Sequence, residues 1–137
     1  MIRNIVKDIE FLKIVSSDAT KDDLHIAADL IDTLTFNRHR CVGMAANMIG
    51  YSKRIIIFED YDKKLVVMIN PIILKCNDEY ETMEGCLSLD GERTTKRYHS
   101  IKVQYYDMDF KMKIKTYRDF QAQIIQHEID HLNGIII

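Results

Sequence analysis

Apolar side chains recur at helical spacing after Thr20, a residue type that commonly caps helices. The repeated positions are Leu24, Ala27, Ile31 and Leu34. Asp23 follows Thr20 by three positions, and a threonine and an acid at this spacing can satisfy the free N–H groups of a first helical turn. The pattern therefore predicts a helix from Thr20 to about Asn37.

A second helical repeat covers Tyr117 to Leu132 and ends at Asn133-Gly134, a typical helix stop. One of its stripes contains Phe120, Ile124, His127 and His131, and the other contains Ile125, Ile129 and Leu132. Because a helix that is apolar on two sides needs neighbours on both, we expect this helix at the centre of the fold. The last three residues, Ile135 to Ile137, are predicted to form a short strand.

Short extended segments dominate the middle of the chain. Ile55 to Phe58 and Leu65 to Ile69 read as buried strands, and Ile72 to Leu74 resumes extended structure after Pro71. The clearest alternation flanks the turn at residues 107–109. It consists of Ile101, Val103 and Tyr105 before the turn and of Phe110, Met112 and Ile114 after it. This pattern predicts a hairpin, which brings the expected total to about six short strands.

Two glycine-containing segments are predicted to be irregular. Residues 38–52 read as a loop with a short extended piece, and residues 79–92 read as an interrupted segment.

The chain of 137 residues has 47% hydrophobic and 29% charged side chains, an ordinary globular balance that indicates a single domain over residues 1–137.

Charge and cysteine content narrow the class of protein. A formal net charge of −2 argues against direct nucleic-acid binding. No apolar run approaches the roughly 18 residues of a membrane span, and charged residues interrupt the N-terminus where a signal peptide would be apolar. Three cysteines make a poor disulfide framework, so we expect a cytoplasmic protein whose cysteines serve in packing, metal binding or catalysis.

The candidate chemistry lies in the run His127-Glu128-Ile129-Asp130-His131 of the second helix. Two histidines four positions apart face the same side of a helix, so both rings can reach one metal ion. A glutamate directly after the first histidine can move a proton of a reacting water. The alternative is two partly buried histidines and an ordinary surface glutamate. Burial in a central helix favours the metal site, because buried histidines need partners.

The third metal ligand is expected upstream of this helix. Only six residues follow His131, and none carries a usual metal-ligating side chain. This argues against an ordinary metalloprotease, which takes a further His or Glu downstream. Cys86 stands out because glycine and serine neighbours make it accessible, although a small buried hydrophobe would look the same. The other upstream candidates are Cys41, Cys76, His99 and several acids.

Three motifs, in order along the chain, resemble those of the peptide deformylase family. They occupy residues 41–48, residues 84–88 (Glu-Gly-Cys-Leu-Ser) and residues 126–131 (Gln-His-Glu-Ile-Asp-His), and the last two match closely. The resemblance spans nearly the whole chain. It implies an α+β fold in which antiparallel strands surround a central C-terminal helix that carries the His-Glu-x-x-His motif. The helix and strand pattern above agrees with that fold.

The resemblance also implies a reaction and a set of roles. The reaction is metal-dependent hydrolysis that removes the N-formyl group from the amino-terminal methionine of nascent peptides and releases formate. Cys86, His127 and His131 would hold one divalent ion, Fe2+ by resemblance, which Zn2+ or Ni2+ can replace. Glu128 would act as general base and then general acid, and the backbone N–H of Leu87 would donate to the oxyanion.

Five further residues match family positions that contact the substrate, an N-formyl-methionyl peptide. They are Val42 and Phe120 at the methionine side chain, Gly43 and Gly85 near the substrate backbone, and Arg93 further along the peptide. Each has a structural alternative: core packing for the apolar pair, tight turns for the glycines, and a solvated surface side chain for the arginine. Because the substrates are nascent chains, association with the ribosome is compatible with the resemblance.

The first motif departs from the family at two positions. Cys41 replaces a glycine, and Met48 replaces a glutamine whose amide, by resemblance, donates to the oxyanion. A thioether cannot donate a hydrogen bond, and loss of one oxyanion donor costs about 10²–10³ in rate. Asn47 is the adjacent amide, but neighbours on an extended segment point to opposite faces. Met48 therefore supports the alternative of a weakened or inactive homologue that binds metal and peptide without efficient turnover.

Overall fold

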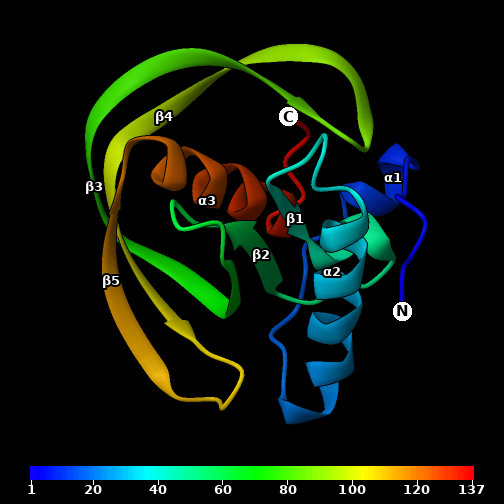
Figure 1. Ribbon diagram of the computed structural model, residues 1–137. Helices are drawn as coiled ribbons and strands as arrows, with labels where there is room; N and C mark the ends of the chain where they lie inside the picture. The colour runs from blue at the N-terminus through cyan, green and yellow to red at the C-terminus, as the bar shows by residue number, and fades with distance from the viewer.

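The computed structural model describes all residues from Met1 to Ile137. Five antiparallel strands in the order β1-β2-β3-β4-β5 form one curved sheet that wraps around helix α3, while helix α2 lies on the other side of β1 and β2 (Figure 1). The elements are α1 (Ile9–Leu12), η1 (Lys21–Asp23), α2 (Leu24–Phe36), β1 (Gly43–Ala45), η2 (Ala46–Ile49), β2 (Ile55–Glu59), β3 (Leu65–Cys86), β4 (Leu89–Tyr106), β5 (Met112–Arg118) and α3 (Asp119–Leu132). The predicted α+β class, with antiparallel strands around the C-terminal helix, is confirmed.

The two predicted helices begin and pack as their sequence patterns indicate. Thr20 Oγ1 accepts a hydrogen bond from the N–H of Asp22, and Asp23 Oδ2 accepts one from the N–H of Thr20 at 2.8 Å. This capping box starts η1, which leads directly into α2. Helix α3 is central, as predicted, and its buried side chains include both histidines of the motif. Apolar residues of α2, α3, β1 and β2 join in one continuous core cluster.

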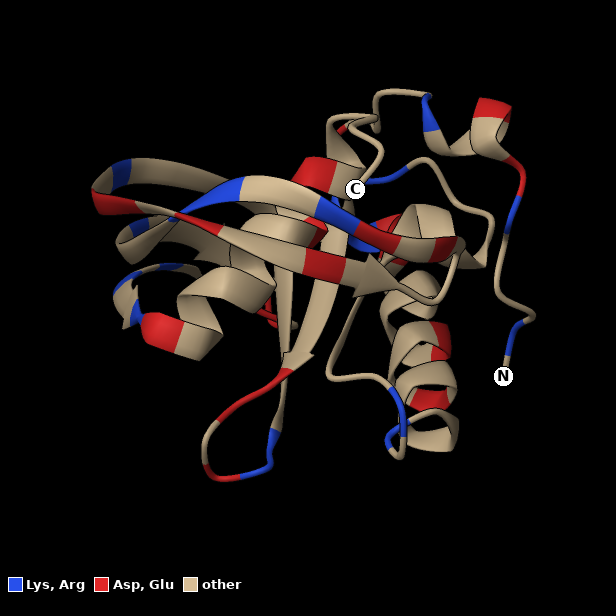
Figure 2. Cartoon of the chain, turned by 90° about the horizontal axis from the view of Figure 1, so that it is seen from above, with Lys and Arg blue, Asp and Glu red and all other residues tan.

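The predicted strands at residues 55–58 and 65–69 and the hairpin about residues 107–109 are confirmed. The expectations of about six short strands and of an irregular segment at residues 79–92 were wrong. Strands β3 and β4 form a long hairpin in which residues pair from Ile69↔Tyr106 to Cys86↔Leu89, and a register shift between Ile69 and Ile72 accommodates Pro71. Acidic and basic residues are interspersed along this hairpin (Figure 2). Most of its outer half is exposed or half-buried, so the apolar alternation that reveals a strand is absent there.

The start of α3 and both termini of the chain also differ from the predicted elements. Helix α3 begins at Asp119, which has a φ of 54°, because β5 continues through Tyr117 to Arg118. No strand forms at residues 135–137, so that prediction was wrong. The N–H of Ile135 instead bonds to the carbonyl of Asp130 and closes the end of α3. The short helix α1, which Asp8 caps, was not predicted.

Candidate metal centre and its cavity

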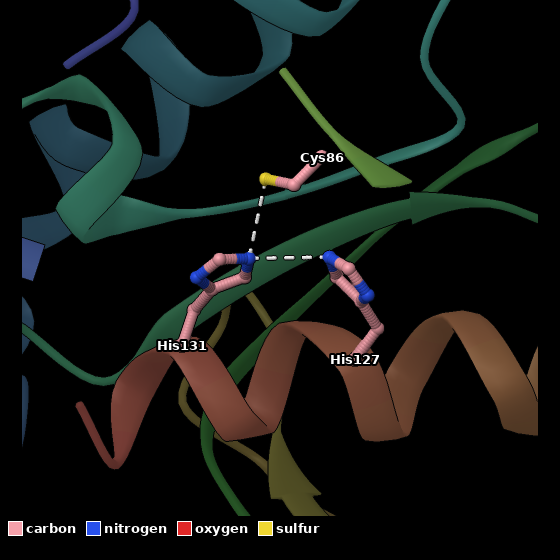
Figure 3. Close-up of side chains that lie close together, drawn as sticks. All are labelled: Cys86, His127 and His131. Carbon is pink, nitrogen blue, oxygen red and sulfur yellow. Dashed lines mark hydrogen bonds between the residues drawn. The ribbon is translucent and has the colours of Figure 1, made fainter. Parts of the chain in front are cut away.

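The side chains of Cys86, His127 and His131 meet at one point between α3 and the end of β3 (Figure 3). Cys86 Sγ lies 3.3 Å from His131 Nε2, and that nitrogen lies 3.1 Å from His127 Nε2. All three ligand atoms lie within 4.8 Å of one another. One helical turn separates the histidines, and the β3–β4 hairpin brings in the cysteine. The three residues expected from the sequence are therefore brought together.

This donor set fits a divalent transition metal. Thiolate sulfur and imidazole nitrogen are the ligands that zinc and iron accept in proteins, and three protein ligands leave a position for a reactant. His127 Nδ1 lies 2.8 Å from Glu84 Oε1, so Glu84 orients the ring with Nε2 toward Cys86 and His131. A carboxylate in this place is the usual means by which proteins fix a ligating histidine.

The two histidines differ in their electrostatic surroundings. Burial alone would lower the pKa of His127, but hydrogen bonds with Cys86 and Glu84 outweigh it and raise the pKa to about 10. The negative charge of Glu84 also favours a metal cation beside the ring. Burial, followed by the nearby charge of His127, lowers the pKa of His131 to about 3. His131 is therefore neutral near pH 7, whereas His127 has to release its proton when a metal ion binds.

A buried ionic network lies behind His127. Arg97 Nη2 donates to Glu84 Oε1 at 2.7 Å, and Arg97 Nη1 donates to Asp130 Oδ2 at 2.7 Å. Gln123 Nε2 donates to Glu84 Oε2 at 2.9 Å. Burial would raise the pKa of Glu84, but hydrogen bonds from His127 and Arg97 outweigh it and lower the pKa to about 2. Glu84 is therefore a fixed anion against the His127 ring.

The members of this network were not predicted as functional residues. Glu84 and Asp130 lie inside the second and third motifs, so their position next to the expected ligands was an available signal. Arg97 and Gln123 belong to no motif. Only the pairing of β4 with β3 and the packing of α3 against the hairpin bring them to Glu84.

Glu128 is a buried acid group on the wall of the cavity that Cys86 and His127 also line. Its side chain lines the adjacent cavity, the residue is only 4% exposed, and its Oε1 atom is buried without a hydrogen-bond partner. Burial raises the pKa of Glu128 to about 7. A buried carboxylate oxygen without a partner inside the protein is suited to contact a bound reactant and to exchange a proton with it.

The cavity beside the centre has a volume of about 470 Å³. Its lining residues are Arg40, Cys41, Val42, Gly43, Met48, Met83, Glu84, Gly85, Cys86, Leu87, Gly91, Phe120, Gln123, Ile124, His127 and Glu128. Four of the five predicted substrate-contact residues are among them, and Arg93 is not. Arg93 lies on β4 opposite Glu84, outside this lining. Val42, Met83 and Phe120 are large apolar side chains that stay exposed at the cavity.

Gly43 is required by helix packing, so its alternative as a tight turn was wrong. It lies in β1, paired with Phe58 of β2. A Cβ atom at this position would lie 2.7 Å from Ile124 Cγ2 and 2.9 Å from Glu128 Oε2. A Cβ atom at Gly85 would meet only ordinary contacts, the nearest being 3.5 Å from the carbonyl oxygen of Gly91. The glycine at 43 thus allows α3 and Glu128 to approach β1.

Replacing Gly43 with alanine is expected to lower the free energy of unfolding by about 1–3 kcal/mol, the usual penalty for overpacking a well-filled interior. The added methyl group has to displace Ile124, Glu128 or both. Urea denaturation of the two proteins measures the loss. Gly85→Ala is the matched control and should stay within about 1 kcal/mol of the unsubstituted protein. Equal losses for the two variants would contradict this account of Gly43.

Met48 and Asn47 both lie in the short helix η2, so the expectation of an extended segment here was wrong, and only Met48 lines the cavity. Met48 is buried, lines the cavity, and its Sδ atom accepts a hydrogen bond from the N–H of Ala45 at 3.5 Å. The Asn47 side chain points to α3, where its Nδ2 donates to the carbonyl of His131 at 2.8 Å. The Asn47 amide is therefore committed elsewhere and does not substitute for a donor at position 48.

Comparison with known proteins identifies similar chains. Residues 2–137 match the profile of the family described as polypeptide deformylase. A peptide deformylase of Clostridium beijerinckii is 56% identical over 137 residues, which covers all of both chains. One from Desulforudis audaxviator is 41% identical over 113 residues, covering 81% of this chain and 72% of its own.

Solved structures agree with the sequence matches. A K1U-bound class I type b peptide deformylase from Acinetobacter baumannii superimposes with a TM-score of 0.89 at 30% identity, covering 99% of this chain and 96% of that one. A peptide deformylase from Legionella pneumophila also has a TM-score of 0.89, at 33% identity, covering 99% of this chain and 83% of that one. No helix of the structure is long and apolar enough to span a membrane.

Proposed function

The chain belongs to the peptide deformylase family and removes the N-formyl group from the amino-terminal methionine of peptides, and we propose that Cys86, His127, His131 and Glu128 carry out this hydrolysis. Enzymes of this family bind a catalytic metal. The observation that carries the proposal is the cluster of three ligand atoms within 4.8 Å of one another, beside a buried carboxylate on the wall of a cavity.

The proposed roles follow from position and charge. Cys86, His127 and His131 would hold a divalent ion, which would supply Lewis-acid polarisation of the reacting groups. Glu128 takes a proton from the attacking water as oxygen bonds to the formyl carbon. The backbone N–H of Leu87, which lines the same cavity, donates to the formyl oxygen as negative charge develops on it. Glu128 then gives the proton to the departing nitrogen as the C–N bond breaks, which yields formate and a free amine.

The substrate contacts are proposals of the same kind. The exposed apolar side chains of Val42 and Phe120 at the cavity support a pocket for the methionine side chain. Gly43 and Gly85 present bare backbone to the same cavity, and β1 is an edge strand that pairs only with β2. Its free edge supports binding of an extended peptide backbone. Arg93, which lies outside the cavity lining, is proposed to contact the peptide further from the reacting end.

We extend this proposal to the identity of the metal and to the cellular setting. Fe2+, with Zn2+ or Ni2+ as replacements, is compatible with a ligand set of one thiolate and two imidazoles. We further propose one domain over residues 1–137, supported by the continuous core, and a cytoplasmic enzyme that meets its substrates as nascent chains at the ribosome. Metal analysis of protein purified without oxygen tests the first point, because iron(II) and its thiolate ligand are sensitive to oxidation.

Formate release from formyl-Met-Ala-Ser by the iron-loaded enzyme, measured without oxygen, tests the proposed function. The matched control peptide is Met-Ala-Ser, which has no formyl group and should give no formate. Release of formate that rises with metal content supports the assignment. A fully metal-loaded, folded protein that releases none would contradict it.

Replacing Met48 with glutamine is expected to raise kcat/KM by up to about 10²-fold, the value of one oxyanion donor. The glutamine Oε1 atom can accept the Ala45 N–H bond that Met48 Sδ now accepts, which leaves the amide N–H₂ free to donate into the cavity. Formate release kinetics measure the gain. Met48→Leu is the control, since it adds no donor and should give no increase. An unchanged rate for a folded, metal-loaded Met48→Gln enzyme would contradict the donor argument.

A further inference from the structure

One guanidinium group on the cavity wall has no acidic partner. Arg40 lines the cavity, and its side chain bonds only to Asn37 Oδ1, through Nε at 3.2 Å and Nη2 at 2.9 Å. No carboxylate lies within ion-pair distance of it. Its neighbour Arg38 differs in this respect, because Arg38 Nη2 pairs with Glu59 Oε1 at 2.9 Å.

The contact with Asn37 holds the Arg40 side chain in place without neutralising it. Asn37 is a buried residue at the C-terminal end of α2, and its Nδ2 donates to the carbonyl of Thr33 at 2.8 Å. Its Oδ1 is thereby presented to the arginine. Because the acceptor is a neutral amide, the full charge of Arg40 and its Nη1 donors remain for a ligand. A side chain that is already positioned loses less conformational entropy when a ligand binds.

The other charged side chains of the cavity wall cannot serve an incoming acid. Glu84 and His127 belong to the buried network behind the metal ligands, and Glu128 is itself acidic. Arg40 is thus the one permanently cationic side chain that lines this cavity. It lies in the turn that precedes β1, three residues before Gly43, on the same cavity wall. Arg40 is therefore placed to meet a residue that follows the methionine of the substrate.

We infer that Arg40 is a specificity-determining residue that favours formyl-methionyl peptides with an acidic side chain in the residues that follow the methionine. The inference rests on the proposed function, since it names the class of substrate for that same cavity. The partner group is a carboxylate, which a guanidinium binds through two parallel hydrogen bonds.

The test compares peptides that differ only in charge. The substrates are formyl-Met-Asp-Ala-amide and formyl-Met-Ala-Asp-amide, each with its asparagine counterpart, and the amide removes the terminal carboxylate. For at least one pair, kcat/KM of the acidic peptide should exceed that of the neutral one by about two- to fivefold, the range of a solvent-exposed ion pair. The ratio should shrink toward one as salt is raised, because salt screens exposed charges.

Arg40→Gln and Arg38→Gln each remove one positive charge, so comparing them separates a direct contact of Arg40 from a general effect of the protein's net charge. Arg40→Gln should reduce the ratio to about one, and Arg40→Lys should retain part of it. Arg38→Gln is the matched control, because Arg38 is already paired and does not line the cavity, and this variant should keep the ratio. Calorimetric binding of the products Met-Ala-Asp-amide and Met-Ala-Asn-amide should show the same pattern without turnover.

Each outcome decides the inference. Equal kcat/KM for both acidic and neutral pairs overturns it, and so does a preference that Arg40→Gln leaves intact or that Arg38→Gln removes equally. If Arg40→Gln does not fold, the salt dependence of the unsubstituted enzyme and the Arg40→Lys ratio give the answer. Absence of formate from every peptide overturns the proposed function and this inference together. Release at equal rates overturns only the inference.

Discussion

Replacing Glu128 with glutamine is expected to lower kcat by about 10²–10⁴-fold, the usual contribution of a positioned general acid–base group. Glutamine has nearly the same shape as glutamate, but its amide cannot take a proton from water or return one to the departing nitrogen. Glu128 is also the only carboxylate on the cavity wall that is not engaged in the ionic network behind His127. No neighbouring acid is placed to replace it.

The effect should fall on the chemical step and not on the fold or the metal. The Oε1 atom of Glu128 makes no hydrogen bond within the protein, so the substitution removes no internal contact there. The ligand atoms of Cys86, His127 and His131 are unchanged. Stopped assays of formate give kcat, while circular dichroism and metal analysis give the fold and the occupancy of the variant.

A matched control is available on the hairpin. Glu92 is an exposed glutamate of β4 that does not line the cavity, so Glu92→Gln makes the same chemical change away from the site. Its kcat should stay within about twofold of the unsubstituted enzyme, as is usual for surface changes. If Glu128→Gln retained kcat to the same degree, the role given to this carboxylate would be wrong.

The sequence predicted α2 and α3 well, because helix caps and the spacing of apolar residues are local features of the chain. Thr20 and Asp23 form the expected capping box, and the two-sided apolar pattern of α3 corresponds to its position inside the sheet. The long β3–β4 hairpin was missed because its outer half is stabilised by backbone pairing between two exposed strands. Pairing of that kind leaves no periodic burial in the sequence.

The residues of the site also fall into two groups: those that local spacing predicts and those that only the tertiary fold brings together. Spacing along one helix was enough to place His127 and His131 on a common side. Cys86 was one of several candidates until the family resemblance selected it, because only the tertiary fold brings it to α3. The clearance that Gly43 gives to Ile124 depends on helix packing, and the free charge of Arg40 depends on which partner its neighbours take. Neither property can be read from a single sequence.

Replacing Cys86 with alanine is expected to remove the bound metal and to lower kcat/KM by more than about 100-fold. Loss of an outer partner of a metal ligand alone costs about 10–100-fold in metal affinity or activity, and loss of a ligand itself should exceed that. Cys86 supplies the only sulfur of the cluster, so the two histidines alone would have to hold the ion. Two imidazoles are a weaker set for iron(II) or zinc than two imidazoles and a thiolate.

Cys76→Ala provides the matched control, because Cys76 is an exposed cysteine on the same strand, β3, and belongs to no metal-ligand cluster. It should keep both metal and activity. Chelation should lower the Tm of the unsubstituted enzyme and of Cys76→Ala, since a ligand that binds the folded state stabilises it. The Tm of Cys86→Ala should not respond to chelator. A Cys86→Ala protein that kept its metal, its activity and its response to chelator would show that the metal is bound elsewhere.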